Sequence, residues 1–191
     1  MAYDNEQVLI FGAKILSTYK ADNDRYFLVQ YYLQDKTIHV YEGKKAMSGF
    51  NGGKFLNRMK VKNPRNGKFY GDESFYVGNI LEISGRTFEL LDAPEYTFCL
   101  METYPERFPP SDMQYTIESL SRYADSHGID LDSLFENKDI IKANYLSRAE
   151  AEEILFSFAP EFPKHYSHTI LRRFMITDKF DYVELLKCIH F

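Results

Sequence analysis

The strongest constraint on the fold of this chain is a single change in its apolar periodicity, at Arg107-Phe108-Pro109-Pro110. Before this point, β-branched and aromatic runs are broken repeatedly by Gly, Asn and Asp, a pattern typical of strands joined by turns. After it, apolar residues recur at helical spacing. The two prolines favour a short, stiff linker. The sequence therefore predicts an α+β chain of two domains, residues 1–108 and residues 109–191.

The first domain is predicted to be an antiparallel sheet that ends in a helix. Two joints between strands, at residues 33–37 and 83–87, are as short as hairpin connections, so neighbouring strands should run antiparallel. From residue 93 to residue 104 the apolar spacing becomes helical, which predicts a helix that covers one open end of the sheet. The predicted strands are 7–17, 25–33, 37–42, 54–61, 76–84 and 86–91.

The second domain is predicted to contain four helices. Three of them are opened by pairs with the spacing of a capping box: the first by Ser111 and Gln114, the second by Ser147 and Glu150, and the fourth by Asp181 and Glu184. The third helix is predicted over residues 162–174. Two equivalent capping signals, at residues 147 and 181, suggest a duplicated helix-loop-helix pair.

The chain carries a net charge of −5, and this deficit is confined to its C-terminal part. Residues 1–110 are balanced, which argues against a nucleic-acid-binding domain. Residues 43–68 contain bases and no acid, so one face of the first domain should be positive. Two interpretations stay open, a contact surface for an acidic partner or a solvated face. The candidate contact residues are Lys44, Lys45, Lys54, Arg58, Lys60, Lys62, Arg65 and Lys68, with Phe50, Phe55, Phe69 and Tyr70 as aromatic anchors.

No segment approaches the roughly 20 apolar residues that a membrane span needs, and the longest early apolar run, residues 8–11, is too short for a signal peptide. We therefore expect an intracellular, soluble protein. The two cysteines, Cys99 and Cys188, are far apart in the sequence and indicate neither a disulfide framework nor a zinc site. Both are expected to be small buried residues.

The helical domain resembles an EF-hand pair in which neither loop is built for calcium. A first loop over residues 139–150 would place Ile141 and Ala143 where oxygen ligands are needed. A second loop over residues 173–184 would begin at Arg173. Calcium binding is therefore not expected. His165 and His168, with His190 and Cys188 as conceivable partners, are interpreted as surface or helix-end residues rather than a metal site.

No catalytic motif is present in the sequence. The chain has no GxSxG, no HExxH and no Walker pattern. The closest approach to a phosphate-binding loop, residues 49–54, is better explained as a turn that needs positive φ. We predict that the protein is not an enzyme and needs no cofactor or metal.

Eight short motifs follow one another along residues 7–103, and in this order they resemble the DM10, or doublet-microtubule, domain family. The closest resemblance is to the last such domain of ciliary EF-hand-containing proteins of the myoclonin and protofilament-ribbon type, where a degenerate EF-hand pair follows. The motifs are Phe11-Gly12-Ala13-Lys14, Asp24-Arg25-Tyr26-Phe27, Tyr31-Tyr32-Leu33, Thr37-Ile38, Ser48-Gly49, Gly52-Gly53-Lys54-Phe55-Leu56, Phe75-Tyr76-Val77-Gly78 and Asp92-Ala93-Pro94-Glu95-Tyr96-Thr97.

This resemblance implies a pleckstrin-homology-like fold, a bent antiparallel β-sheet with a capping helix, followed by a small helical degenerate EF-hand-like pair. It also implies a structural microtubule inner protein of the cytoskeleton, in the lumen of doublet microtubules of the ciliary or flagellar axoneme. Its partners would be tubulin and neighbouring inner proteins. Tubulin is acidic, so residues 44–68 would face it. A phosphoinositide- or acidic-partner-binding adaptor is the alternative function, and a calcium-responsive regulator is a more distant one.

Overall fold

The computed structural model describes residues 6–44 and 51–190. The chain divides into two compact units, Met1–Phe108 and Pro109–Phe191. We call them the sheet unit and the helical unit and describe each by itself.

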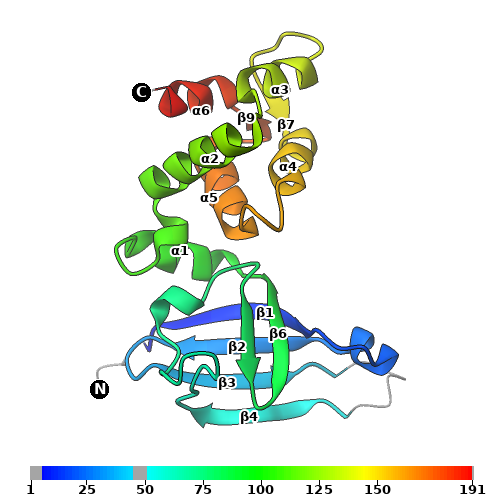
Figure 1. The fold of residues 1–191 in the computed structure, drawn as a ribbon, viewed down its shortest axis with the longest axis vertical. Helices are drawn as coiled ribbons and strands as arrows, with labels where there is room; N and C mark the ends of the chain where they lie inside the picture. The colour runs from blue at the N-terminus through cyan, green and yellow to red at the C-terminus, as the bar shows by residue number, and fades with distance from the viewer. Residues whose placement is uncertain (1–5, 45–50, 191) are drawn as a thin grey trace. The chain divides into compact units, whose positions relative to one another are not determined.

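The sheet unit is a curled, half-barrel sheet of six antiparallel strands in the order β4-β3-β2-β1-β6-β5 (Figure 1). The strands are β1 (Val8–Ile15), β2 (Phe27–Tyr32), β3 (Thr37–Glu42), β4 (Gly53–Met59), β5 (Ile80–Ile83) and β6 (Arg86–Asp92). Short 3-10 turns occupy Lys20–Asp24 and Asp72–Ser74, and helix α1 spans Glu95–Thr103. The α+β class, the six strands and the terminal helix are as predicted.

One predicted strand is too long. Residues 76–79 form a turn instead of extending β5, because Gly78 has a φ of 94° and the Asn79 N–H bonds back to the Tyr76 carbonyl. A turn of this kind interrupts the ladder that a strand needs. The apolar pattern alone did not reveal it.

The core of the sheet unit lies on the inner face of the curl, where alternate residues of β2 and β3 and most residues of β1 that face it are buried. The Tyr31 and Phe75 rings stack with centroids 3.9 Å apart, and Phe27 meets Phe88 edge to face at 5.1 Å. Helix α1 is fixed to β1 by Thr97, which is fully buried. Its hydroxyl accepts the Ile10 N–H at 3.0 Å and contacts the Ile10 carbonyl at 3.2 Å.

The helical unit contains five α-helices among the described residues, one more than predicted (Figure 1). The additional helix, α3, is short and polar on most of its surface, so its apolar pattern is weak. A small sheet of order β7-β9-β8 joins the loops between the helices. The elements are α2 (Met113–His127), α3 (Leu131–Lys138), β7 (Leu146–Ser147), α4 (Arg148–Ser157), α5 (Lys164–Phe174), β8 (Met175–Ile176), β9 (Lys179–Phe180) and α6 (Tyr182–Ile189).

Two of the three predicted helix starts are confirmed. Ser147 and Glu150 form a full capping box at α4, and Asp181 caps α6 by accepting the Glu184 N–H. The predicted cap at Ser111 is wrong, since Asp112 caps α2 and Ser111 lies in the 3-10 turn Pro109–Ser111.

The expectation that both cysteines are buried is also wrong. Cys99 and Cys188 are both exposed. Cys99 lies on the outer side of α1, where its thiol reaches Glu95 at 3.3 Å, because the inner side is taken by Phe98 and Met101. Within residues 6–44 and 51–190, no helix has the length and apolarity that crossing a membrane requires.

Candidate partner-binding surface

The predicted basic residues follow the edge of the sheet that β4 forms. Lys44 and Lys54 are exposed at the start of this region, and the rest continue along β4 into a hairpin at residues 61–70. Lys45 and the predicted anchor Phe50 lie outside the described residues. The described cations do not form one equivalent set, because Arg58 and the hairpin cations have different surroundings.

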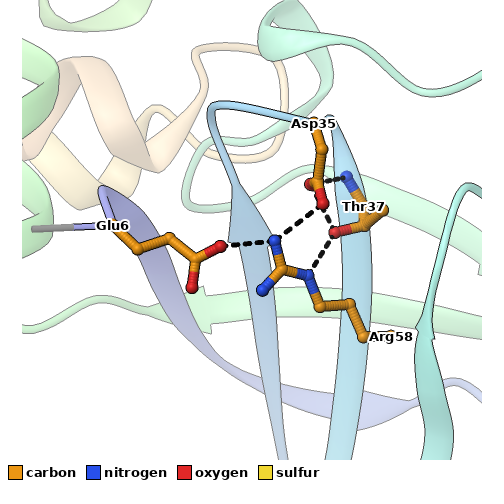
Figure 2. A network of polar contacts seen from close by, with 4 residues as sticks. All are labelled: Glu6, Asp35, Thr37 and Arg58. Carbon is orange, nitrogen blue, oxygen red and sulfur yellow. Dashed lines mark hydrogen bonds and ion pairs between the residues drawn. The ribbon is translucent and has the colours of Figure 1, made fainter. Parts of the chain in front are cut away.

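Arg58 is part of a polar network within the sheet unit (Figure 2). Its guanidinium donates to the Asp35 carboxylate at 2.7 Å and to the Thr37 hydroxyl at 2.8 Å, and it also pairs with Glu6. The same guanidinium lies 3.6 Å from the centre of the Tyr32 ring. Glu6 first, and then Asp35, raise the pKa of Arg58. Its charge is thus matched by two carboxylates.

Four cations remain, three on the hairpin and one directly before it, and in the described part of the chain they form no ion pair. They are Lys60, Lys62, Arg65 and Lys68, and all are exposed. The hairpin backbone is well ordered by its own hydrogen bonds, from Asn63 N–H to the Lys68 carbonyl at 2.7 Å and from Tyr70 N–H to the Val61 carbonyl at 3.0 Å. The side chain of Asn63 accepts the Arg65 N–H at 3.0 Å and closes the tip.

The hairpin is anchored in the core at its base. Tyr70 is buried, and its hydroxyl meets both the N–H and the carbonyl of Glu82 on β5, at 2.9 and 3.2 Å. Because successive residues of a strand point to opposite sides, the neighbouring Phe69 points outward and is 52% exposed. The predicted anchors Phe55 and Tyr70 are therefore core residues, and Phe55 packs against Phe27 and Phe88. Of the three predicted anchors that the structure describes, Phe69 is the exposed one.

In the helical unit, the first loop is closed by the carboxylate of Asp139. Its oxygens accept the N–H groups of Ala143 at 2.9 Å and Asn144 at 2.7 Å, and the Tyr182 hydroxyl donates to it at 3.0 Å. Burial by itself would raise the pKa of Asp139, but these three donors outweigh it and lower that pKa. Burial, followed by the bond to Asp139, raises the pKa of Tyr182 to about 12.

The two loops meet through their strands, where Leu146 of β7 pairs with Phe180 of β9. Glu150 is held by Ser147, whose hydroxyl and N–H bond to the carboxylate and lower its pKa. The second loop is a tight hairpin in which Met175 pairs with Phe180. No group of three or more His, Cys, Asp or Glu suited to a metal occurs in the described part of the chain.

His165 is a core residue rather than the surface or helix-end residue that the sequence suggested. It is fully buried on α5, and its Nε2 lies 2.8 Å from the Ser111 hydroxyl. Burial lowers the pKa of His165 to about 3. Apolar spacing does not distinguish such a histidine from an exposed one, because its partner is 54 positions away.

Comparison with known families decides the affiliation of the sheet unit. The DM10 domain model matches residues 1–97, just over half of the chain. The chain belongs to the DM10 domain family. This confirms the resemblance carried by the eight motifs.

Three curated relatives show how far the similarity extends. EF-hand domain-containing family member C2 of Bos taurus is 36% identical over 127 residues, 62% of this chain, and the protein of the same name from Danio rerio is 28% identical over 88% of it. EF-hand domain-containing protein 1 of Homo sapiens is 33% identical over 58% of the chain. These matches cover 17%, 24% and 18% of the relatives, so the chain spans about a fifth of their length.

The DM10 motif residues serve mainly the fold. A Cβ atom at Gly12 would collide with the carboxylate of Asp92 and the hydroxyl of Tyr26. Arg25 is held by a two-pronged pair with Glu42, at 2.7 and 3.1 Å, and by Asp22 at 2.9 Å. Gly12 and Arg25 therefore serve the fold, whereas the hairpin 61–70 lies outside these motifs and exposes its cations.

Proposed function

We propose that this chain is a non-catalytic structural protein of the ciliary or flagellar cytoskeleton, which binds tubulin in the lumen of doublet microtubules and stabilises their wall. Membership in the DM10 family supports the cytoskeletal setting. The observation that carries the proposed contact is the anchored hairpin 61–70. With the adjoining Lys60 it presents four cations that have no carboxylate partner among residues 6–44 and 51–190, beside an exposed aromatic residue. Neighbouring microtubule inner proteins would be further partners.

Such a hairpin suits a repeated protein lattice. Its backbone is ordered before binding, so little conformational entropy is lost on contact. Positive charge steers association with an acidic surface, and an exposed aromatic side chain can supply the central anchor. Many modest contacts along a lattice then add up to firm retention.

The proposal includes two finer assignments of fold. The curled sheet with its terminal helix would be pleckstrin-homology-like. The helical unit would be a degenerate EF-hand pair, and the pairing of Leu146 with Phe180 between its two loops supports this assignment. In such a pair, the donors that surround Asp139 occupy the oxygens that a calcium ion would need.

The test is binding of purified protein to isolated axonemal doublets. In Lys62→Glu/Lys68→Glu, retention should fall about tenfold or more, because attraction becomes repulsion. The matched control is Lys20→Glu/Arg86→Glu, which makes the same charge change at exposed positions of the same unit outside residues 60–70. Arg58 is left intact, since its reversal would break the network of Figure 2. Equal retention of both variants would refute this contact.

A phosphoinositide- or acidic-partner-binding adaptor is the alternative, and the same free cations favour it. A parallel arm with vesicles of neutral lipid, with and without a phosphoinositide, separates the two. Binding to phosphoinositide vesicles that needs Lys62 and Lys68, together with no retention on doublets, would establish the adaptor and overturn the tubulin proposal.

A further inference from the structure

The helical unit has a hollow of about 500 Å³ between α3 and α6. Asp132 and Glu136 are one helical turn apart on α3 and line one side. Val183 and Leu186 of α6 supply an apolar floor, and Lys187 and His190 line the other side. We call this hollow the acidic trough.

Negative charge predominates around the trough. A neighbouring hollow of about 180 Å³ shares Asp132 and His190 with it and adds Asp125 and Asp130. The nearby basic side chains already have partners, because Lys187 pairs with Glu184 at 3.3 Å and the His190 imidazole lies 2.9 Å from Asp132. The Ser133 hydroxyl and N–H lower the pKa of Asp130 and keep it ionised.

Apolar surface adjoins the same region. The loop that contributes Asn144 to the trough also carries Ile140 and Ile141, which are 88% and 80% exposed. Two consecutive isoleucines at such exposure are unfavourable in water, because each would gain free energy on burial. A trough lined by carboxylates and apolar side chains is complementary to a partner that presents cations around an apolar or aromatic side chain.

The hairpin 61–70 of this same chain has that chemistry. Its Phe69 is exposed, the Lys62 ammonium lies 5.5 Å from the centre of the Phe69 ring, and Lys68 is adjacent in sequence. We propose that the acidic trough of one copy receives the basic hairpin 61–70 of a second copy. Phe69 then packs on Val183 and Leu186, while Lys62 and Lys68 face Asp132 and Glu136.

This contact joins two different surfaces of the chain, so it is heterologous. Copies therefore associate head to tail, and the assembly is open or closed according to whether the rotation between successive copies closes. The proposal goes beyond tubulin binding, and tubulin and a second copy compete for the hairpin. It is tested on the purified 191-residue chain without tubulin, so its failure and the failure of the tubulin proposal are separate results.

The experiment is sedimentation velocity over a range of protein concentrations. The unmodified chain should form larger species as concentration rises, and added salt should reverse this. Both Lys62→Glu/Lys68→Glu and Asp132→Lys/Glu136→Lys should reduce the association constant about tenfold or more. The control Glu161→Lys/Asp178→Lys makes the same charge change at exposed positions of the helical unit that do not line the trough, and it should associate like the unmodified chain.

Mixing the two charge-reversed variants gives the decisive result. The acidic hairpin of one variant matches the basic trough of the other, and the remaining hairpin and trough are unmodified, so the mixture should associate although neither variant does alone. Circular dichroism checks the fold, and Asp132→Asn/Glu136→Gln replaces the lysine variant if that one does not fold. A chain that stays monomeric at all concentrations, or a mixture that does not associate, would overturn the proposal.

Discussion

The two units stabilise their inner polar groups by different chemistry. In the sheet unit these groups are mostly ion pairs, such as Arg25 with Glu42 and Asp22, and Arg107 with Asp72 at 2.8 Å. In the helical unit they are largely neutral, since His165 bonds to the Ser111 hydroxyl and Thr169 donates to the Pro110 carbonyl at 2.7 Å. Arginine and carboxylate pairs keep their charges down to about pH 4, whereas a histidine gains a proton near pH 6.5.

The largest expected effect is a selective loss of stability of the helical unit in mild acid. His165 has a pKa of about 3 in the folded chain and an ordinary value of 6.5, so between these values the unfolded chain binds the proton and the folded chain does not. Protonation therefore favours unfolding, and each pH unit below 6.5 removes about 1.4 kcal/mol. Going from pH 7 to pH 4 should weaken this unit by about 3 kcal/mol.

Hydrogen exchange of individual amides measures this effect. Protection of the α5 amides should fall between pH 6.5 and pH 4 after correction for the intrinsic exchange rate, while that of the β2 amides stays constant. The pKa of Asp22 in the sheet unit is lowered, chiefly by hydrogen bonds from Ser17 and Arg25, so its contribution is lost only below about pH 4. In His165→Leu, protection of the α5 amides should depend much less on pH. A smaller dependence should remain, because burial also lowers the pKa of His168. An equal loss of amide protection in α5 and β2 would contradict the proposed difference between the two units.

A smaller effect is expected at the hydroxyl that closes the first loop. Tyr182→Phe keeps the ring that stacks on Phe135 with centroids 5.9 Å apart but removes one of the three donors to Asp139. A hydrogen bond to a charged group contributes about 1.5–3 kcal/mol. Tyr26→Phe in the sheet unit is the matched control, because its hydroxyl reaches Asp92 only at 3.5 Å on the surface. Chemical denaturation should show a clear loss for Tyr182→Phe and almost none for Tyr26→Phe.

Most of the elements could be predicted because their signals are local. Alternating strands, short joints and the capping pairs Ser147/Glu150 and Asp181/Glu184 all act within a few residues. The errors arise where a distant residue decides. Ser111 has the spacing of a cap, yet its hydroxyl meets His165, and the turn at Gly78 is fixed by the carbonyl of Leu90 at 2.7 Å.

The candidate surface shows the same limit. The acid-free interval identified a basic region, and the hairpin cations within it are indeed exposed. Sequence spacing could not separate them from Arg58, because Glu6 is 52 positions and Asp35 is 23 positions from it. Nor could the sequence show that Phe69 is exposed and Tyr70 is buried. Which of two neighbouring residues points inward depends on the register with β5. The acidic trough needs α3 and α6 side by side, and α3 has too weak a pattern to be predicted.

The smallest expected effect is that of calcium, for which we predict none. Both oxygens of Asp139 accept protein donors, and Ile141 and Ala143 offer no oxygen from their side chains. A ligand that binds only the folded state raises the melting temperature, so millimolar calcium should leave both melting temperature and helix content unchanged. Tyr182→Phe removes a competing donor and gives a stricter form of the test, since it too should stay unresponsive while the side chains of residues 141 and 143 lack oxygens. A saturable calorimetric signal with a stoichiometry near one, in either protein, would show that the loop binds the ion after all.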